Sequence, residues 1–251
     1  VFLLDKWTKV NGGRVTALIV DHGIRDESCD EAITVKSWLA EKGLESEILF
    51  ANLTRSIPSL QSVARYERYR LMGDWCRERG VLHLCMGHQK EDQAETLILN
   101  LMRGSGIDGL ASMAPIVERE SYRILRPLLS VSKSRLIACL RSESQTFVKD
   151  PSNEDMAFKR VRIRALMPEF AREGGNIERL SKVAKRMAEA RSALEEETAA
   201  LMAESVVVLP EGYARLNPQP ILKSSREVAL RALGRVLRTI GGKLHSPRGD
   251  Q

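Results

Sequence analysis

Apolar and polar positions in the first half of the chain follow two alternating patterns. Short apolar runs, typical of buried strands, separate longer segments in which apolar residues recur every three or four positions, as on one side of a helix. The expected strands are 15–20, 46–50, 81–86 and, more weakly, 122–125. Because strands that alternate with helices form parallel sheets, we predict an α/β fold with a Rossmann-like, doubly wound parallel sheet.

Two helices are expected between these strands. One begins at Ser28, where Ser28 and Glu31 form a capping box, and ends near Gly43. The other covers 61–79. Residues 1–7 have the pattern of the middle of an amphipathic helix without an N-cap, so we expect the chain to lack its true beginning.

The composition changes after Pro168. Residues 176–205 are rich in Ala, Glu, Leu, Lys and Arg and contain neither Pro nor Gly, which favours one long connector helix. A small hairpin over 206–216 and a helix over 226–240 should follow. This remainder is small for an independent domain, so we expect the other end of the chain to be incomplete as well.

In the helix that should follow strand 81–86, apolar residues for the core and polar residues suited to catalysis fall on different sides. The residues expected in its buried stripe are Ala94, Leu97, Ile98, Leu101 and Met102. Three polar residues, Asp92, Glu95 and Thr96, should instead lie together elsewhere on its surface. Since open α/β sheets bind ligands at the carboxyl ends of their strands, Asp92 would stand where a catalytic group is useful.

Composition and charge narrow the class of protein. Hydrophobic residues at 43%, charged residues at 29% and the lack of a long apolar run indicate a soluble, cytoplasmic protein. The four cysteines form no C-x-x-C pair and should be free thiols. The net charge of +6 equals the excess within 159–191, where ten basic and four acidic residues occur. Such a concentration is typical of phosphate-backbone binding, although a solvated helix face also explains it.

Several short motifs have a structural explanation as well as a functional one. His88 and Asp92 can be a capping residue and a carboxylate stabilised by the helix dipole. The glycine-rich segment 103–109 can be a helix C-cap or a close approach to phosphate. Residues 21–23 fit a plain turn after a strand, and 150–153 are a strong turn signal.

Taken together and in their order along the chain, the motifs indicate a protein family more specifically than any one of them does alone. They are D-H-G-I-R at 21–25, A-R-Y-E-R-Y at 64–69, H-Q-K-E-D-Q-A-E-T at 88–96, R-G-S-G-I-D-G-L at 103–110, R-P-L-L at 126–129, D-P-S-N at 150–153 and R-V-R-I-R at 160–164. The set resembles the tRNA(Ile)-lysidine synthetase family of N-type ATP pyrophosphatases over about residues 1–170, and more loosely over the connector helix.

The resemblance implies an enzyme that uses ATP and magnesium to adenylate the C2 carbonyl oxygen of the wobble cytidine in an isoleucine tRNA with a CAU anticodon. The ε-amine of free L-lysine would then displace AMP to give lysidine. Presenting that amine in its neutral form at pH 7 costs roughly 4.6 kcal/mol, because the lysine side-chain pKa is near 10.4. A carboxylate that accepts the proton adds about 10²- to 10⁴-fold in rate. No membrane partner is implied, and a homo-oligomer stays open.

The resemblance also gives roles to individual residues. Asp92 would be the general base, with a magnesium contact, and Arg65 would be a second catalytic residue that steadies phosphate. The remaining assignments are His22, Gly23, His88, Arg103 and Gly104 for ATP; Arg160, Arg162 and Arg164 for tRNA; and Glu95, Thr96, Asp150 and Asn153 as supporting residues.

The chain departs from the family pattern in three places. The family usually has H-H-x-D-D where this chain has H-Q-K-E-D at 88–92, so a role for the second histidine does not transfer. The family's R-N-x-x-R is replaced by R-V-R-I-R at 160–164. The S-G-G-x-D-S loop that grips pyrophosphate should lie just before Val1, so we expect this polypeptide to bind ATP poorly and to turn over little.

Three segments are therefore expected: a catalytic domain over 1–168, a helical linker over 169–205 and a partial tRNA-binding domain over 206–251. Two rival functions stay open. One is tRNA thiolation by a related pyrophosphatase, which commonly uses paired cysteines that this chain lacks. The other is a non-catalytic tRNA-binding remnant, in which the basic tract works and the active site does not.

Overall fold

A computed structural model describes residues 1–25, 27–53, 60–148 and 154–242. The chain forms two compact units. Unit 1 contains Val1–Asp92 and Ala114–Leu166, and unit 2 contains Gln93–Met113 and Met167–Gln251. The boundary falls within helix α4 (Lys90–Leu101), whose first turn belongs to unit 1, and within α7 (Lys159–Arg172).

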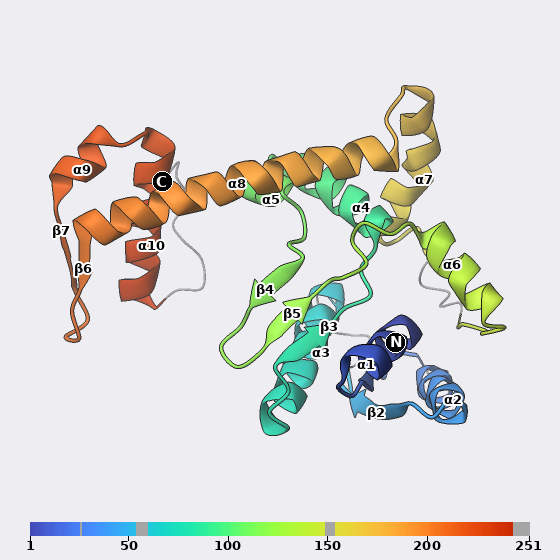
Figure 1. Cartoon of the computed structure of the whole chain (residues 1–251). Coiled ribbons are helices and arrows are strands. Elements are labelled where there is room, and N and C mark those ends of the chain that lie inside the picture. Colours follow the sequence, from blue (N-terminus) through green and yellow to red (C-terminus); the bar gives the residue numbers. More distant parts are fainter. Residues whose placement is uncertain (26, 54–59, 149–153, 243–251) are drawn as a thin grey trace. The chain divides into compact units, whose positions relative to one another are not determined.

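Unit 1 has the α/β architecture that the apolar pattern predicted (Figure 1). Its elements are α1 (Phe2–Asn11), β1 (Thr16–Asp21), α2 (Ser28–Glu41), β2 (Glu45–Phe50), α3 (Leu60–Glu78), β3 (His83–Cys85), β4 (Ile116–Glu118), β5 (Arg123–Leu125) and α6 (Lys133–Ser142). Strands β1 and β2 pair in parallel, and β5 pairs in parallel with β3. The parallel sheet prediction is confirmed.

One strand was missed. β4 pairs antiparallel with β5, through a tight turn in which Arg119 N–H donates to the Tyr122 carbonyl. Its sequence, Ile-Val-Glu, shows no alternation of apolar and polar residues, and its pairing with β5 is a tertiary contact.

Two apolar clusters hold unit 1 together. In the larger one, Met72, Trp75 and Cys76 on α3 pack with Leu84 of β3 and Ile124 of β5. In the smaller one, Ala17 of β1 packs with Leu39 and Leu44, at and beyond the end of α2. Both strand pairs are thereby packed against helices, with their carboxyl ends left for polar residues.

Three details differ from the sequence expectations. Helix α2 has Glu27 at its N-cap, and the Ser28 hydroxyl donates to the Arg25 carbonyl, so the capping box is wrong. On α4, Leu101 and Met102 are 61% and 72% exposed, because the helix ends at this point. Glu95 is only 3% exposed and lies among the buried positions, not on the open surface with Asp92.

Unit 2 is built on α8 (Ile177–Ser205), which Figure 1 shows as one continuous helix. The Asn176 side chain caps its first turn by accepting from Arg179 N–H at 2.8 Å. The other elements are α5 (Ile107–Leu110), the antiparallel pair β6 (Val206–Val208) and β7 (Ala214–Leu216), α9 (Pro218–Lys223) and α10 (Arg226–Gly241). Helix α10 packs on α8 through Val228, Ala232 and Leu201. The long helix, the hairpin and the last helix are confirmed.

No helix in the described part of the chain has the length and apolar character needed to cross a membrane.

Candidate active site

Three strands of unit 1 are followed by residues whose side chains can bind ligands or transfer protons. β1 is followed by His22, β3 leads into His88, and β5 is followed by Arg126. The carboxyl ends of parallel strands are the ligand-binding edge of an open α/β sheet. The start of α1 also lies close to Cys85, at the end of β3. A helix N-terminus at that edge favours anions.

Asp92 lies in the first turn of α4, and both of its carboxylate oxygens have neighbours. Oδ2 accepts a hydrogen bond from Gln89 N–H at 2.9 Å, so Asp92 caps the first turn of the helix together with Gln89, not with His88. Oδ1 lies 3.9 Å from an Arg160 guanidinium nitrogen. The turn is anchored because Glu91 accepts from Lys133 N–H at 2.9 Å. Asp92 therefore has a fixed position, and its Oδ1 atom faces the Arg160 guanidinium.

His88 is held by a buried arginine. Arg126, which is 7% exposed, donates from Nε to His88 Nδ1 at 3.3 Å and from Nη1 to the Ala114 carbonyl at 2.7 Å. Burial lowers the pKa of His88 to about 4, and the charges of Arg126, Arg65 and Arg160 act in the same direction against Asp92. His88 is consequently a neutral imidazole at pH 7.

Helix α3 contributes two arginines on the stripe that carries Met72. Arg65 lies over the Tyr69 ring, 5.1 Å from its centroid. Arg68 forms no ion pair with a described residue, and its Nε is buried without a hydrogen-bond partner. Burial lowers the pKa of Arg68, and the charges of Arg65 and Arg160 lower it further. An unpaired guanidinium in such surroundings is costly unless a ligand supplies the negative charge.

Arg68 is the site residue that sequence reasoning did not select. Its signal was present, because Arg65 and Arg68 continue the i, i+3, i+7 stripe that places Met72 in the core. Arg65 is exposed and Arg68 half-buried at the end of this stripe, and a charged residue that continues a buried stripe is the kind of exception that marks a binding site.

His22 and Gly23 form the turn after β1. Gly23 N–H donates to Asp21 Oδ1 at 2.9 Å, and Gly23 has a φ of +66°, a conformation that glycine adopts without strain. The Nδ1 atom of His22 is buried and has no partner among the described residues. Burial and the nearby Arg68 charge lower the pKa of His22 against the effect of Asp21. His22 therefore shares its surroundings with Arg68.

The three arginines expected to bind tRNA have different surroundings. Arg160 lies beside Asp92 and is close enough to His88 and Arg68 for its charge to act on both. Arg162 donates to the Met156 and Ala157 carbonyls, both at 2.7 Å, and so holds the start of α7. Arg164 is exposed.

Four other expected residues lie in unit 2, and two lie outside the described residues. Arg103 and Gly104 end α4: their backbone amides donate to the Asn100 and Leu101 carbonyls, and Gly104 has a φ of +68°. The C-cap explanation therefore holds for that segment. Glu95 is buried and Thr96 partly buried on α4. Asp150 and Asn153 fall outside the described residues.

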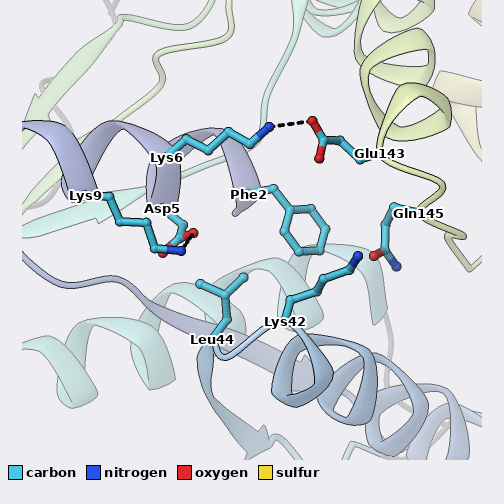
Figure 2. A pocket seen from close by; sticks show the side chains of 8 residues that line it. All are labelled: Phe2, Asp5, Lys6, Lys9, Lys42, Leu44, Glu143 and Gln145. Carbon is cyan, nitrogen blue, oxygen red and sulfur yellow. Dashed lines mark hydrogen bonds and ion pairs between the residues drawn. The ribbon is translucent and has the colours of Figure 1, made fainter.

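A separate hollow of unit 1 contains none of the expected site residues. Figure 2 shows this cavity of about 150 Å³, which is lined by Phe2, Asp5, Lys6, Lys9, Lys42, Leu44, Glu143 and Gln145. Lys6 pairs with Glu143, and Lys9 pairs with Asp5 at 2.7 Å. Its charges are mostly neutralised by each other, in contrast to those around Arg68.

The described residues include no group of three or more His, Cys, Asp or Glu side chains that could hold a metal ion. Asp92 offers a single carboxylate at the site. Magnesium needs only one or two protein carboxylates when substrate phosphates supply other ligands, so Asp92 fits an ion that arrives with a nucleotide.

Arginines, two histidines with lowered pKa values and one fixed carboxylate thus gather near the ends of parallel strands, an arrangement that suits an anionic ligand such as a nucleotide in an α/β domain. The family model described as PP-loop domain matches residues 1–170. Among curated proteins, the chain is 38% identical to tRNA(Ile)-lysidine synthase of Bradyrhizobium sp. (strain BTAi1), with 96% of this chain and 70% of that protein covered. The chain belongs to the tRNA(Ile)-lysidine synthase family of PP-loop ATP-binding enzymes, which are ligases.

Further relatives agree with this membership. The Bradyrhizobium diazoefficiens protein of the same name is 41% identical, with 78% of this chain and 55% of that protein covered. The Rhodopseudomonas palustris protein is 38% identical, with 94% of this chain and 69% of that protein covered. The chain thus spans between 55% and 70% of the length of these three relatives.

A solved structure shares the fold. It is the U34-tRNA thiolase NcsA from Methanococcus maripaludis with its [4Fe-4S] cluster, with a TM-score of 0.64 and 16% identity over 75% of this chain and 66% of that chain. At this identity, the likeness supports the fold and no shared chemistry.

Proposed function

We propose that this chain carries the catalytic part of an enzyme that joins L-lysine to C2 of the wobble cytidine in an isoleucine tRNA with a CAU anticodon, with ATP converted to AMP and diphosphate. The family membership supports tRNA modification by a PP-loop enzyme. The observation that carries the finer proposal is Asp92, a fixed carboxylate 3.9 Å from Arg160 at the ligand-binding edge of the sheet.

Each residue has a task in this reaction. Arg65, Arg68 and Arg160 attract and orient phosphate oxygens, using the planar fork of the guanidinium. Magnesium, bound with ATP and Asp92, would neutralise phosphate charge. Asp92 accepts the proton that the lysine ε-ammonium must lose before its nitrogen attacks C2. Once C2–N forms and the C2–O bond breaks, AMP leaves with that oxygen.

The segments have corresponding roles in the proposal. Residues 1–168 would carry the ATP chemistry, 169–205 would be a helical linker, and 206–251 would contribute to tRNA binding. Arg164 and the basic residues of α8 would contact tRNA phosphates. Charge of this kind supplies affinity that is independent of sequence, so recognition of the anticodon requires other contacts.

The test measures AMP release with the isoleucine tRNA, in the presence and absence of L-lysine. It uses the chain as it stands and a form extended at its N-terminus by a strand and an S-G-G-x-D-S pyrophosphate loop of the family pattern. Lysine-dependent AMP release with this tRNA, and not with a methionine tRNA, is expected from the extended form. AMP release that ignores lysine would contradict the proposal.

Two alternative functions predict different results in this test. A binding-only remnant would shift the tRNA in a gel but release no AMP, even in the extended form. A thiolation enzyme would require sulfur instead of lysine. The four cysteines are free, and none belongs to a metal-binding group in the described part of the chain, which disfavours thiolation.

A further inference from the structure

The contact between Arg126 and His88 has a consequence for the chemistry of the site. A guanidinium carries only donors, so the nitrogen that it contacts must act as the acceptor. Arg126 Nε lies 3.3 Å from His88 Nδ1. Nδ1 is therefore unprotonated, and a neutral imidazole in this position carries its single proton on Nε2.

Arg126 is itself held in place. Its Nη1 donates to the Ala114 carbonyl at 2.7 Å, its backbone N–H donates to the Pro115 carbonyl at 2.8 Å, and its side chain is buried with the end of β5. Burial and the Nη1 hydrogen bond to the Ala114 carbonyl hold the guanidinium in place, with Nε facing Nδ1. The surroundings thus select one of the two neutral forms of the imidazole.

The other ring nitrogen is left for a ligand. Among the described residues, the His88 side chain forms a hydrogen bond at Nδ1, to Arg126. Asp92, Arg65, Arg126 and Arg160 are the charged groups close enough to act on the ring. Three of these four are cations, so the molecule that completes the site is expected to be an anion.

We propose that Arg126 is a positioning residue that holds His88 with its proton on Nε2, so that His88 donates a hydrogen bond to a phosphate oxygen of the bound adenine nucleotide. The inference deepens the proposed function and rests on it for the identity of the ligand. Because the imidazole is neutral, this hydrogen bond brings no further cation into a site that already contains several.

The first experiment reads the proton position directly. The full chain is labelled with ¹⁵N-histidine, and long-range ¹H–¹⁵N spectra at pH 7 distinguish protonated from unprotonated ring nitrogens, with His88→Gln identifying the His88 signals. A protonated Nε2 is expected. In Arg126→Met, both neutral forms should be visible. A protonated Nδ1 in the unaltered chain would overturn the proposal.

The second experiment asks whether Arg126 acts through His88. ATP affinity is measured by calorimetry for Arg126→Met, His88→Ala and the double variant, each made in the form extended by the pyrophosphate loop. Each single change should weaken binding about tenfold, the worth of one hydrogen bond near charge. The double variant should be no weaker than His88→Ala, because the two residues act as one unit. Losses that multiply would show that Arg126 acts independently of His88.

A third measurement covers the case in which Arg126→Met does not fold. His88→Gln retains an N–H donor near the position of Nε2, whereas His88→Ala retains none. ATP affinity should stay within about threefold in the glutamine variant and fall about tenfold in the alanine variant. Equal losses would count against donation from Nε2.

These results are separable from the proposed function. A chain that makes lysidine with Nδ1 protonated would overturn the positioning role alone. Protonated Nε2 and the expected ATP affinities, without lysidine formation by the extended form, would overturn the proposed reaction alone.

Discussion

Two arginines, Arg231 in unit 2 and Arg68 in unit 1, have opposite surroundings. In unit 2, Arg231 of α10 donates to Asp108, Glu195 and Glu227 at 2.8–3.1 Å, and Arg235 also pairs with Glu195. In unit 1, Arg68 has no ion-pair partner among the described residues.

The contrast separates structural charge from functional charge. The carboxylates around Arg231 come from α5, α8 and α10, so the ion pairs connect three helices. Arg68 and its neighbours Arg65 and Arg160 are like charges held near each other, which costs electrostatic free energy unless an anion offsets it. Such an arrangement is useful only when an anion binds. Five changes test this contrast, beginning with the largest expected effect.

The change Asp92→Asn should reduce turnover the most. Asparagine preserves the shape and can still accept from Gln89 N–H, but it is no base. Turnover of the extended form should fall at least about 10- to 100-fold, with tRNA affinity unchanged. Lysine-dependent AMP release and a tRNA gel shift measure the two quantities. Full activity would reduce Asp92 to its capping role.

The change Arg68→Met should weaken ATP binding about tenfold or more, because hydrogen bonds to charged groups contribute roughly 1.5–3 kcal/mol. The free energy of unfolding should stay equal or rise, since a partly buried, unpaired charge is removed. Calorimetric titration of the extended form with ATP and thermal unfolding check both. Lower stability with unaltered ATP affinity would mean that Arg68 is structural.

The change Arg231→Met should do the reverse. It removes the common partner of three carboxylates, and we expect the free energy of unfolding to fall by about 1–2 kcal/mol, a modest figure because those carboxylates are largely solvated. ATP affinity should not change. Denaturant unfolding of Arg231→Met is compared with Lys185→Met, whose exposed ion pair with Glu189 should matter by less than about 0.5 kcal/mol.

Lowering the pH should reduce the stability of the folded chain through protonation of His88. Its pKa is about 4 in the folded chain, below the ordinary 6.5, so the unfolded chain takes up the proton first. The stability that depends on neutral His88 is therefore complete above about pH 6.5 and is lost as the pH falls toward 4. An NMR titration should give a midpoint near 4, and His88→Gln should lose less thermal stability between pH 7 and 4.5. A midpoint near 6.5 would show that the ring is solvated.

The smallest expected effect is that of Arg164→Gln. If Arg164 contacts one tRNA phosphate, its loss should weaken binding modestly and lower the slope of log affinity against log salt by about 1. The control is Arg172→Gln, which removes an exposed arginine of the same helix whose side chain pairs with Glu169 at 2.7 Å. Equal slopes for both variants would assign Arg164 to the solvated helix face.

The sequence predicted the elements better than their details. Parallel β1 and β2, the long α8 and the hairpin follow from local periodicity, which a chain carries in itself. The capping box at Ser28 failed because one residue's shift in the helix start changes which groups need partners. The antiparallel strand β4 was not predicted, because its pairing with β5 is decided by tertiary contacts.

For the site, the order of motifs along the sequence already named Asp92, His88 and Arg160 and the family to which they belong. It could not show that Arg160 lies beside Asp92, that Arg126 faces Nδ1 of His88, or that Arg68 lacks a counter-ion. Periodicity and motifs are local properties, whereas charges, protons and burial depend on residues far apart in the chain. Only folding brings those residues within a few ångströms, where their energies are set.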